Sequence, residues 1–73
     1  MLGNPKYNYD DIVSFKIKTE DDVEHTLTGK VYIIDRYGTF EQNEEVSYDI
    51  MVDDWGGQPC LFKHIRESHL IKL

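Results

Sequence analysis

The chain has 73 residues, of which 14 are Asp or Glu and 8 are Lys or Arg, giving a formal net charge of −6. This length accommodates one small domain whose apolar residues must nearly all serve a single thin core, so a deep enclosed active site is not expected. The negative charge opposes general attraction to nucleic acid. No apolar run reaches the length of a membrane span and no secretory signal is recognisable, so we expect a cytoplasmic protein.

Two antiparallel strands are predicted in the first half of the chain. Between residues 11 and 18, apolar side chains occupy alternate positions, as in a half-buried strand. The polar residues 19–22 suit a hairpin turn, so the next strand should run antiparallel to the first. Its apolar residues keep the odd positions from 23 to 33. Within this stretch, Gly29 is expected to mark a bend or a close backbone approach.

A third strand is predicted after a turn and a polar, acidic connection. Four alternate side chains are expected to face the core: Val46, Tyr48, Ile50 and Val52. Residues 53–59 contain two glycines and a proline. This composition predicts a loop, and Trp55 is its one large residue.

Residues 60–73 allow two interpretations. As a helix, they would place Leu61 and Ile65 on one apolar face. As extended chain, residues 59–65 would form a hairpin arm with the third strand, residues 66–69 one tight helical turn, and the last residues a closing strand. We favour the extended interpretation because the third strand needs a partner and the Gly-rich loop suits a hairpin.

This arrangement resembles the SH3-like small barrel superfamily. The likeness is carried by Asp11-Ile12-Val13, Thr28-Gly29-Lys30-Val31, Tyr48-Asp49-Ile50-Met51-Val52 and Ile65-Arg66-Glu67-Ser68-His69-Leu70. The last segment is similar to Tudor-like and KOW-like endings, in which a glutamate-serine pair opens a single-turn helix. The resemblance implies an all-β, SH3-like small barrel of about five antiparallel strands, with one short 3-10 turn before the last strand. Residues 11–73 would form the barrel and residues 1–10 an N-terminal extension. The chain also resembles small phage and prophage proteins of Gram-positive bacteria.

Metal binding and catalysis are not expected. The side chains that suggest a metal are Cys60, His64, His69 and His25. On a strand, Cys60 and His64 would lie about 13 Å apart, whereas a helix would bring them together. Nothing places a base beside Cys60, and this single cysteine cannot form an internal disulfide. The carboxylates lie mostly in connections, where solvent keeps their pKa values ordinary. We therefore predict no enzyme, no cofactor and no metal.

Aromatic residues near the loops predict a binding surface. Trp55, with Tyr37 and Phe40, is the candidate, and Asp53 and Asp54 supply an acidic rim. Such a surface suits a partner carrying Lys or Arg, through ion pairing and cation-π attraction. In the alternative interpretation, Trp55 folds back as a lid on the open end of the barrel. If the ring is a surface residue, its replacement by Ala should change the unfolding free energy by less than about 1 kcal/mol.

The sequence thus predicts a non-catalytic protein-interaction module that binds a basic partner, as a monomer or a weak homo-oligomer. Two alternatives remain. In the first, the protein is an acidic decoy that imitates nucleic acid with the carboxylates of Glu20, Asp21, Asp22, Glu44, Glu45, Asp53 and Asp54. In the second, it binds nucleic acid directly through the basic residues Lys16, Lys18 and Lys30, with Tyr32 stacking on bases.

Overall fold

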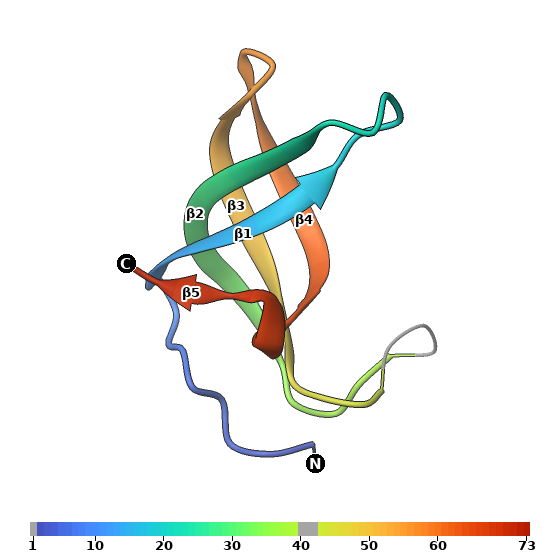
Figure 1. Cartoon of the computed structure of the whole chain (residues 1–73). Coiled ribbons are helices and arrows are strands. Elements are labelled where there is room, and N and C mark those ends of the chain that lie inside the picture. The colour runs from blue at the N-terminus through green and yellow to red at the C-terminus, as the bar shows by residue number, and fades with distance from the viewer. Residues whose placement is uncertain (1, 40–42) are drawn as a thin grey trace.

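A single antiparallel sheet of five strands accounts for most of the chain. The computed structural model describes residues 2–39 and 43–73. The elements are β1 (Ile12–Lys18), β2 (Glu24–Asp35), β3 (Ser47–Trp55), β4 (Gln58–Arg66), the 3-10 helix η1 (Glu67–His69) and β5 (Ile71–Lys72). The strand order is β4-β3-β2-β1-β5, so the last strand returns to pair with the first (Figure 1).

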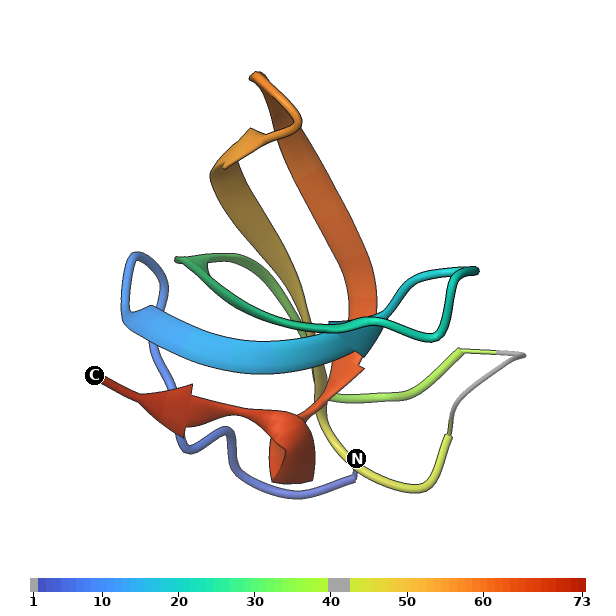
Figure 2. The same ribbon diagram turned by 45° about the horizontal axis from the view of Figure 1, so that its top comes forward.

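This architecture confirms the predicted fold class: all-β, five antiparallel strands, and one 3-10 turn before the last strand. The extended interpretation of residues 60–73 is also confirmed, because β4 pairs along β3 from Gln58 to Arg66. The sheet curls on itself, as Figure 2 shows, and its strand order is compatible with an SH3-like barrel. Within the described chain, no helix has the length and apolar character needed to cross a bilayer.

Strand β2 pairs with two neighbouring strands because it bends in its middle. Its first half pairs with β1 and its second half with β3, and Lys30 has a partner on each side. The preceding residue, Gly29, lies against the β3 backbone. A Cβ built at this position would come within 2.4 Å of the Met51 carbonyl oxygen and 2.8 Å of Ile50 Cγ2. The sequence prediction for Gly29 is therefore confirmed, and the reason for glycine is a close approach of two strands.

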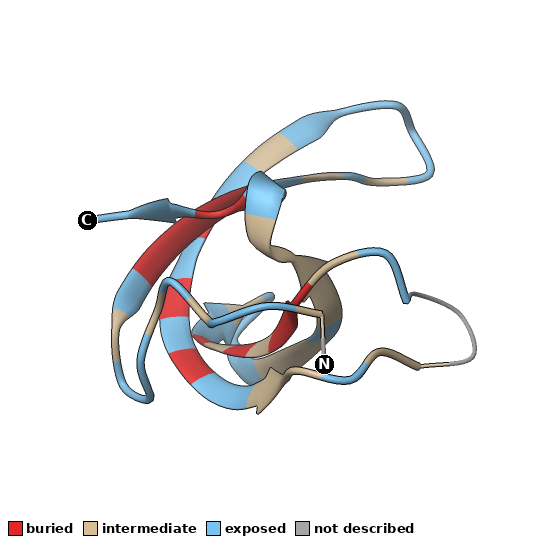
Figure 3. Cartoon of the chain, turned by 90° about the horizontal axis from the view of Figure 1, so that it is seen from below, coloured by how far each residue is buried: buried red, intermediate tan, exposed pale blue. Residues whose placement is uncertain are grey.

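The core lies inside the curled sheet and follows the period of two. Buried side chains recur along the strands (Figure 3). The side chains predicted to face inward from β3 and from the first part of β1 are buried, so these predictions are confirmed. Side chains alternate between the two faces of a pleated strand, which is the reason for the period of two. The buried hydrophobic residues are Val13, Phe15, Leu27, Val31, Val46, Tyr48, Ile50, Val52 and Leu70.

The unbroken alternation predicted for β2 is wrong at both of its ends. Val23 precedes the strand and is exposed, and Ile33 is also exposed. The register with β3 shifts between Val31 and Ile33, where β2 carries one extra residue. This bulge inverts the side-chain direction, so Ile34 packs against the core instead of Ile33.

The loop predicted for residues 53–59 is much shorter in the structure. Strand β3 continues to Trp55 and β4 begins at Gln58, so Gly56 and Gly57 alone form the turn. Both glycines have positive φ angles, 66° and 87°, which suit a tight two-residue hairpin. The register between β3 and β4 shifts between Val52 and Trp55, which marks a second bulge.

The N-terminal segment packs against the domain. The Tyr7 ring meets the Tyr48 ring edge-on at 5.5 Å between centroids, and the Tyr7 hydroxyl donates to the Leu70 carbonyl at 3.1 Å. The Tyr48 hydroxyl donates to Glu67, whose carboxylate also accepts the Lys6 backbone N–H. Burial, and then this bond to Glu67, raise the pKa of the Tyr48 phenol above its ordinary range. The segment thereby joins β3 to η1.

Replacing Gly29 by Ala is expected to lower the free energy of unfolding by about 1–3 kcal/mol, because the new methyl group must displace the β3 backbone. Urea denaturation followed by circular dichroism measures the change. The control is Thr28→Ala, at an exposed position of the same strand. Equal stability of the Gly29 variant and the wild type would contradict the close approach described here.

Candidate interaction surface

Trp55 lies at the open end of the curled sheet, where it contacts two other rings. It is the last residue of β3 and is half-buried. Its ring meets His25 edge-on at 5.3 Å between centroids and Phe62 at 6.0 Å. We call these three residues the Trp55 mouth. Phe62 in turn meets the buried Phe15 ring at 5.5 Å, so the mouth continues into the core.

The bulge in β3 explains why Trp55 faces inward. Strict alternation after Val52 would place residue 54, not residue 55, on the core side. The extra residue at Asp53–Asp54 shifts the alternation, so both aspartates are exposed while Trp55 packs against the core cluster. The ring therefore packs against the core, as the lid interpretation expects, and its remaining surface meets solvent.

Two hairpins that contribute to the Trp55 mouth carry exposed acidic residues. Asp53 and Asp54 are exposed and directly precede Trp55 on β3. The turn between β1 and β2 contributes a second group, because His25 brings the start of β2 against Trp55. The exposed carboxylates of this turn are Glu20, Asp21 and Asp22. Glu24 alternates with His25 and belongs to the outer side of the β1–β2 pair, where it meets Lys16. Lys18 and Lys16 pair with Asp22 and Glu24 at 3.4 and 3.7 Å, and these ion pairs are exposed.

Hydrogen bonds fix the geometry of both hairpins. The Thr19 hydroxyl donates to the Asp21 carboxylate, and this bond is the main reason that the pKa of Asp21 lies below its ordinary value. Thr19 Oγ1 also lies 3.5 Å from His25 Nε2, which links the turn to the Trp55 mouth. On the other hairpin, the Asp54 carboxylate accepts the Gly57 N–H at 2.8 Å. One acidic residue of each hairpin is thus oriented by a local hydrogen bond.

The structure does not bring Tyr37 to Trp55. Tyr37 follows Asp35, which pairs with Ser47 at the first residue of β3, whereas Trp55 is at the last. The length of β3 separates these ends by about 26 Å, and Figure 1 shows the two connections at opposite ends of the domain. Tyr37 is 74% exposed in a turn whose N–H groups bond to Asp35. Phe40 lies outside the described residues.

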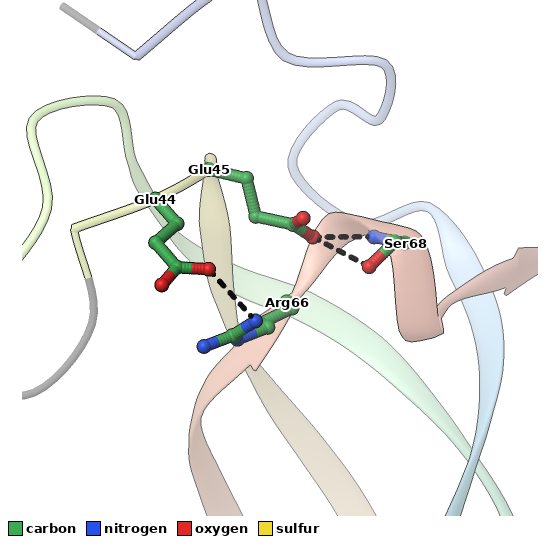
Figure 4. A network of polar contacts seen from close by, with 4 residues as sticks. All are labelled: Glu44, Glu45, Arg66 and Ser68. Carbon is green, nitrogen blue, oxygen red and sulfur yellow. Dashed lines mark hydrogen bonds and ion pairs between the residues drawn. The ribbon is translucent and has the colours of Figure 1, made fainter.

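Two of the carboxylates assigned to the acidic connection before β3 hold the C-terminal part of the fold (Figure 4). The Glu45 carboxylate accepts the Ser68 backbone N–H at 2.8 Å and the Ser68 hydroxyl at 2.7 Å. These two bonds lower the pKa of Glu45, which corrects the expectation of an ordinary value. The neighbouring Glu44 pairs with Arg66 at 3.3 Å. The sequence pattern carried no signal for these contacts, since the partners are distant along the chain.

The metal candidates are dispersed. Cys60 is opposite Val52 in the β3–β4 ladder, and His64 occupies a bulge of β4 with a φ angle of 58°. The His64 backbone N–H is held by the Asp49 carboxylate at 3.1 Å. Among residues 2–39 and 43–73, no group of three or more His, Cys, Asp or Glu side chains is placed to hold a metal ion.

Comparison with known proteins identifies no relative of this chain. No family profile matches the sequence, and neither the curated proteins nor the solved structures yield a match.

Replacing Trp55 by Ala is expected to lower the free energy of unfolding by about 2 kcal/mol, because the ring contacts His25 and Phe62. This revises the smaller effect expected from the sequence. Urea denaturation followed by circular dichroism measures it. Tyr37→Ala, a matched aromatic change at an exposed site, should cost less than about 0.5 kcal/mol. Equal losses in the two variants would contradict the packing of Trp55.

The Glu45 carboxylate should make stability depend on pH. Because its folded pKa lies below the ordinary 4.5, its contribution is complete above that value and is lost as the pH falls through the lower folded pKa. Thermal unfolding between about pH 5 and pH 3 should therefore show a shallower loss of stability for Glu45→Gln than for the wild type. Glu20→Gln, at an exposed turn position, is the control. Identical pH profiles for Glu45→Gln and the wild type would refute the role of Glu45.

Proposed function

We propose that this protein is a non-catalytic protein-interaction module whose Trp55 mouth binds a Lys or Arg side chain of a partner with a basic surface. The observation that carries the proposal is the half-buried Trp55 ring at the end of β3, which follows two exposed aspartates on its own strand and contacts His25 of the hairpin that carries the acidic turn. A cation over an indole face gains electrostatic attraction, and nearby carboxylates strengthen it. Asp53 and Asp54 directly precede Trp55 on the same strand.

The predicted surface is thereby redefined. Trp55, Asp53 and Asp54 remain in it, and Tyr37 leaves it because of its position at the opposite end of β3. His25 and the acidic turn before it take the place of Tyr37. This exchange supports a single site, since the ring contact between His25 and Trp55 brings the start of β2 to the end of β3.

The decoy alternative receives less support. Its carboxylates would need to form one phosphate-like array, but Glu44 and Glu45 lie beside η1, away from Asp53 and Asp54. The first pair also has intramolecular partners in Arg66 and Ser68. Direct nucleic-acid binding through the basic residues receives less support because the net charge of −6 opposes attraction to phosphate.

Membership of the SH3-like superfamily and an origin in a phage or prophage belong to the same proposal. The strand order, the bend at Gly29 and the 3-10 turn at Glu67–His69 support the first part. The small size of the chain is the support for the second.

A basic peptide provides a direct test, because Trp55 is the single tryptophan and its fluorescence reports on the mouth. The probe is a blocked peptide of alternating glycine with lysine or arginine. We expect it to change the Trp55 emission, and we expect Asp53→Asn to weaken its binding about threefold to fivefold. Some binding should persist when NaCl is raised from about 50 to about 500 mM, because the indole contact is screened less than exposed ion pairs.

Asp10→Asn is the matched control, since it removes the same charge from an exposed residue of the N-terminal segment. It should leave binding unchanged. An unchanged emission on saturation with the peptide, or equal weakening by both variants, would refute the Trp55 mouth as the site. Complete loss of binding at high salt together with competition by DNA would support the decoy instead.

A further inference from the structure

A groove of about 470 Å³ lies on the outer side of β1, away from the Trp55 mouth. It is bounded by β1, by the start of β2 and by the chain from η1 to β5. Ile71 contributes exposed apolar surface, whereas the Phe15 side chain is buried on the inner face of β1. Three residues of the lining carry hydroxyl groups. These hydroxyls belong to Ser14, Thr26 and Ser68. The groove therefore combines apolar surface from Ile71 with the hydroxyl groups of Ser14 and Thr26, since the Ser68 hydroxyl already donates to Glu45.

The groove begins where β5 stops covering the edge of β1. Strand β5 pairs with β1 only at Val13 and Ser14. The 3-10 helix η1 precedes β5 in the chain and does not pair with β1. Figure 1 shows β5 alongside the first part of β1 alone. Beyond Ser14, no strand of the described residues pairs with this edge. An uncovered edge presents backbone donors and acceptors that can pair with another chain.

The backbone groups that face this edge can be identified from the register. The Leu73 N–H donates to the Ile12 carbonyl at 3.1 Å, so Ile12 directs its carbonyl toward β5. Backbone direction alternates along a strand, so Ser14 and then Lys16 face the same way. Ser14 is opposite Ile71 of β5, whereas Lys16 is beyond its end. The Lys16 N–H and carbonyl thus lie at the groove with no strand beside them.

The charge of the groove is opposite to that of the protein. Its titratable lining residues are Lys16 and His69, and no carboxylate from the described part of the chain lines it, although the net charge is −6. Lys16 does pair with Glu24 at 3.7 Å, but both side chains are more than half exposed, so exchanging this partner costs little. A carboxylate is the complementary group for such a lining.

A second copy of this chain does not fit the same edge. Two β1 edges paired with each other would bring Lys16 and Lys18 of both copies together, with unfavourable repulsion. The opposite sheet edge, β4, is protected by its bulge at His64 and by Pro59. The uncovered part of β1 is therefore the edge that a different, acidic chain can approach.

We propose that this groove binds an extended segment of a partner protein, which adds as a strand to β1 beyond the end of β5 and places an Asp or Glu side chain beside Lys16 and His69. Main-chain hydrogen bonds to Lys16 supply affinity, and the groove selects the acidic side chain. This site is independent of the Trp55 mouth. Its lining residue Thr26 is exposed on the outer side of β2, whereas the neighbouring His25 packs inward against Trp55.

The test uses amide hydrogen exchange and chemical shifts measured by nuclear magnetic resonance on the full chain. The probe is a blocked peptide of alternating valine and glutamate. We expect shift changes at Lys16, Thr26 and His69, and at least about tenfold slower exchange of the Lys16 amide when the peptide is bound. Unchanged Lys16 exchange at saturating peptide, or no shift change at about millimolar peptide, would overturn the proposal.

Matched peptides and variants separate strand addition from charge attraction. A peptide N-methylated at alternate residues, which cannot donate along its edge, should lose binding, as should one with lysine in place of glutamate. Lys16→Gln should weaken binding about threefold or more, whereas Lys30→Gln, at an exposed β2 position, should not. Equal binding of the methylated peptide would overturn the proposal. So would a single-stranded DNA probe that shifts the groove residues when the acidic peptide does not.

The Trp55 mouth supplies an internal control. Asp53→Asn should leave binding of the acidic peptide unchanged, because Asp53 is on β3 and does not line the groove. Loss of acidic-peptide binding in this variant would mean that the groove is not the site. If the basic peptide does not bind at Trp55, the exchange and shift measurements at Lys16 still test the groove. The two proposals are therefore tested independently.

Discussion

The contact between Gly29 and the backbone of β3 sets the shape of the whole domain. Because this position has no side chain, β2 can lie close to Met51 while its two halves pair with different neighbours. The bend lets a five-stranded sheet enclose its own apolar face with no covering helix in the described chain. Both proposed surfaces depend on it. One is at the end of the curled sheet, and the other is on the outer side of the β1–β2 pair.

Much of the fold is predictable because it follows local periodicity. The alternation around Tyr48 identifies β3 and its buried face, and a glycine within the alternating stretch of β2 identifies the bend. The bulges are not predictable in this way. An extra residue near Tyr32 and another at Asp53–Asp54 invert the inward face without changing the composition of the strand. The bulges depend on the register between paired strands, and the residue pattern of one strand carries no information about that register.

The candidate site is partly predictable for the same reason. Trp55 and its two aspartates are conspicuous in the sequence, but the choice of neighbours depends on which turns share one end of the sheet. Tyr37 is therefore excluded and His25 included, although the sequence gives His25 no distinguishing feature. The contacts of Glu45 with Ser68 and of Tyr7 with Tyr48 are not predictable from the sequence either, because the partners are far apart along the chain.

The bond between the Lys6 N–H and the Glu67 carboxylate has a consequence for folding. It joins residues 61 positions apart, and the β1–β5 pairing joins residues at a similar separation. Contacts of this span cost more chain entropy than hairpin contacts, so we expect them to form late, after the hairpins have brought their ends together. Their loss should then open the N-terminal segment, η1 and β5 together rather than one at a time.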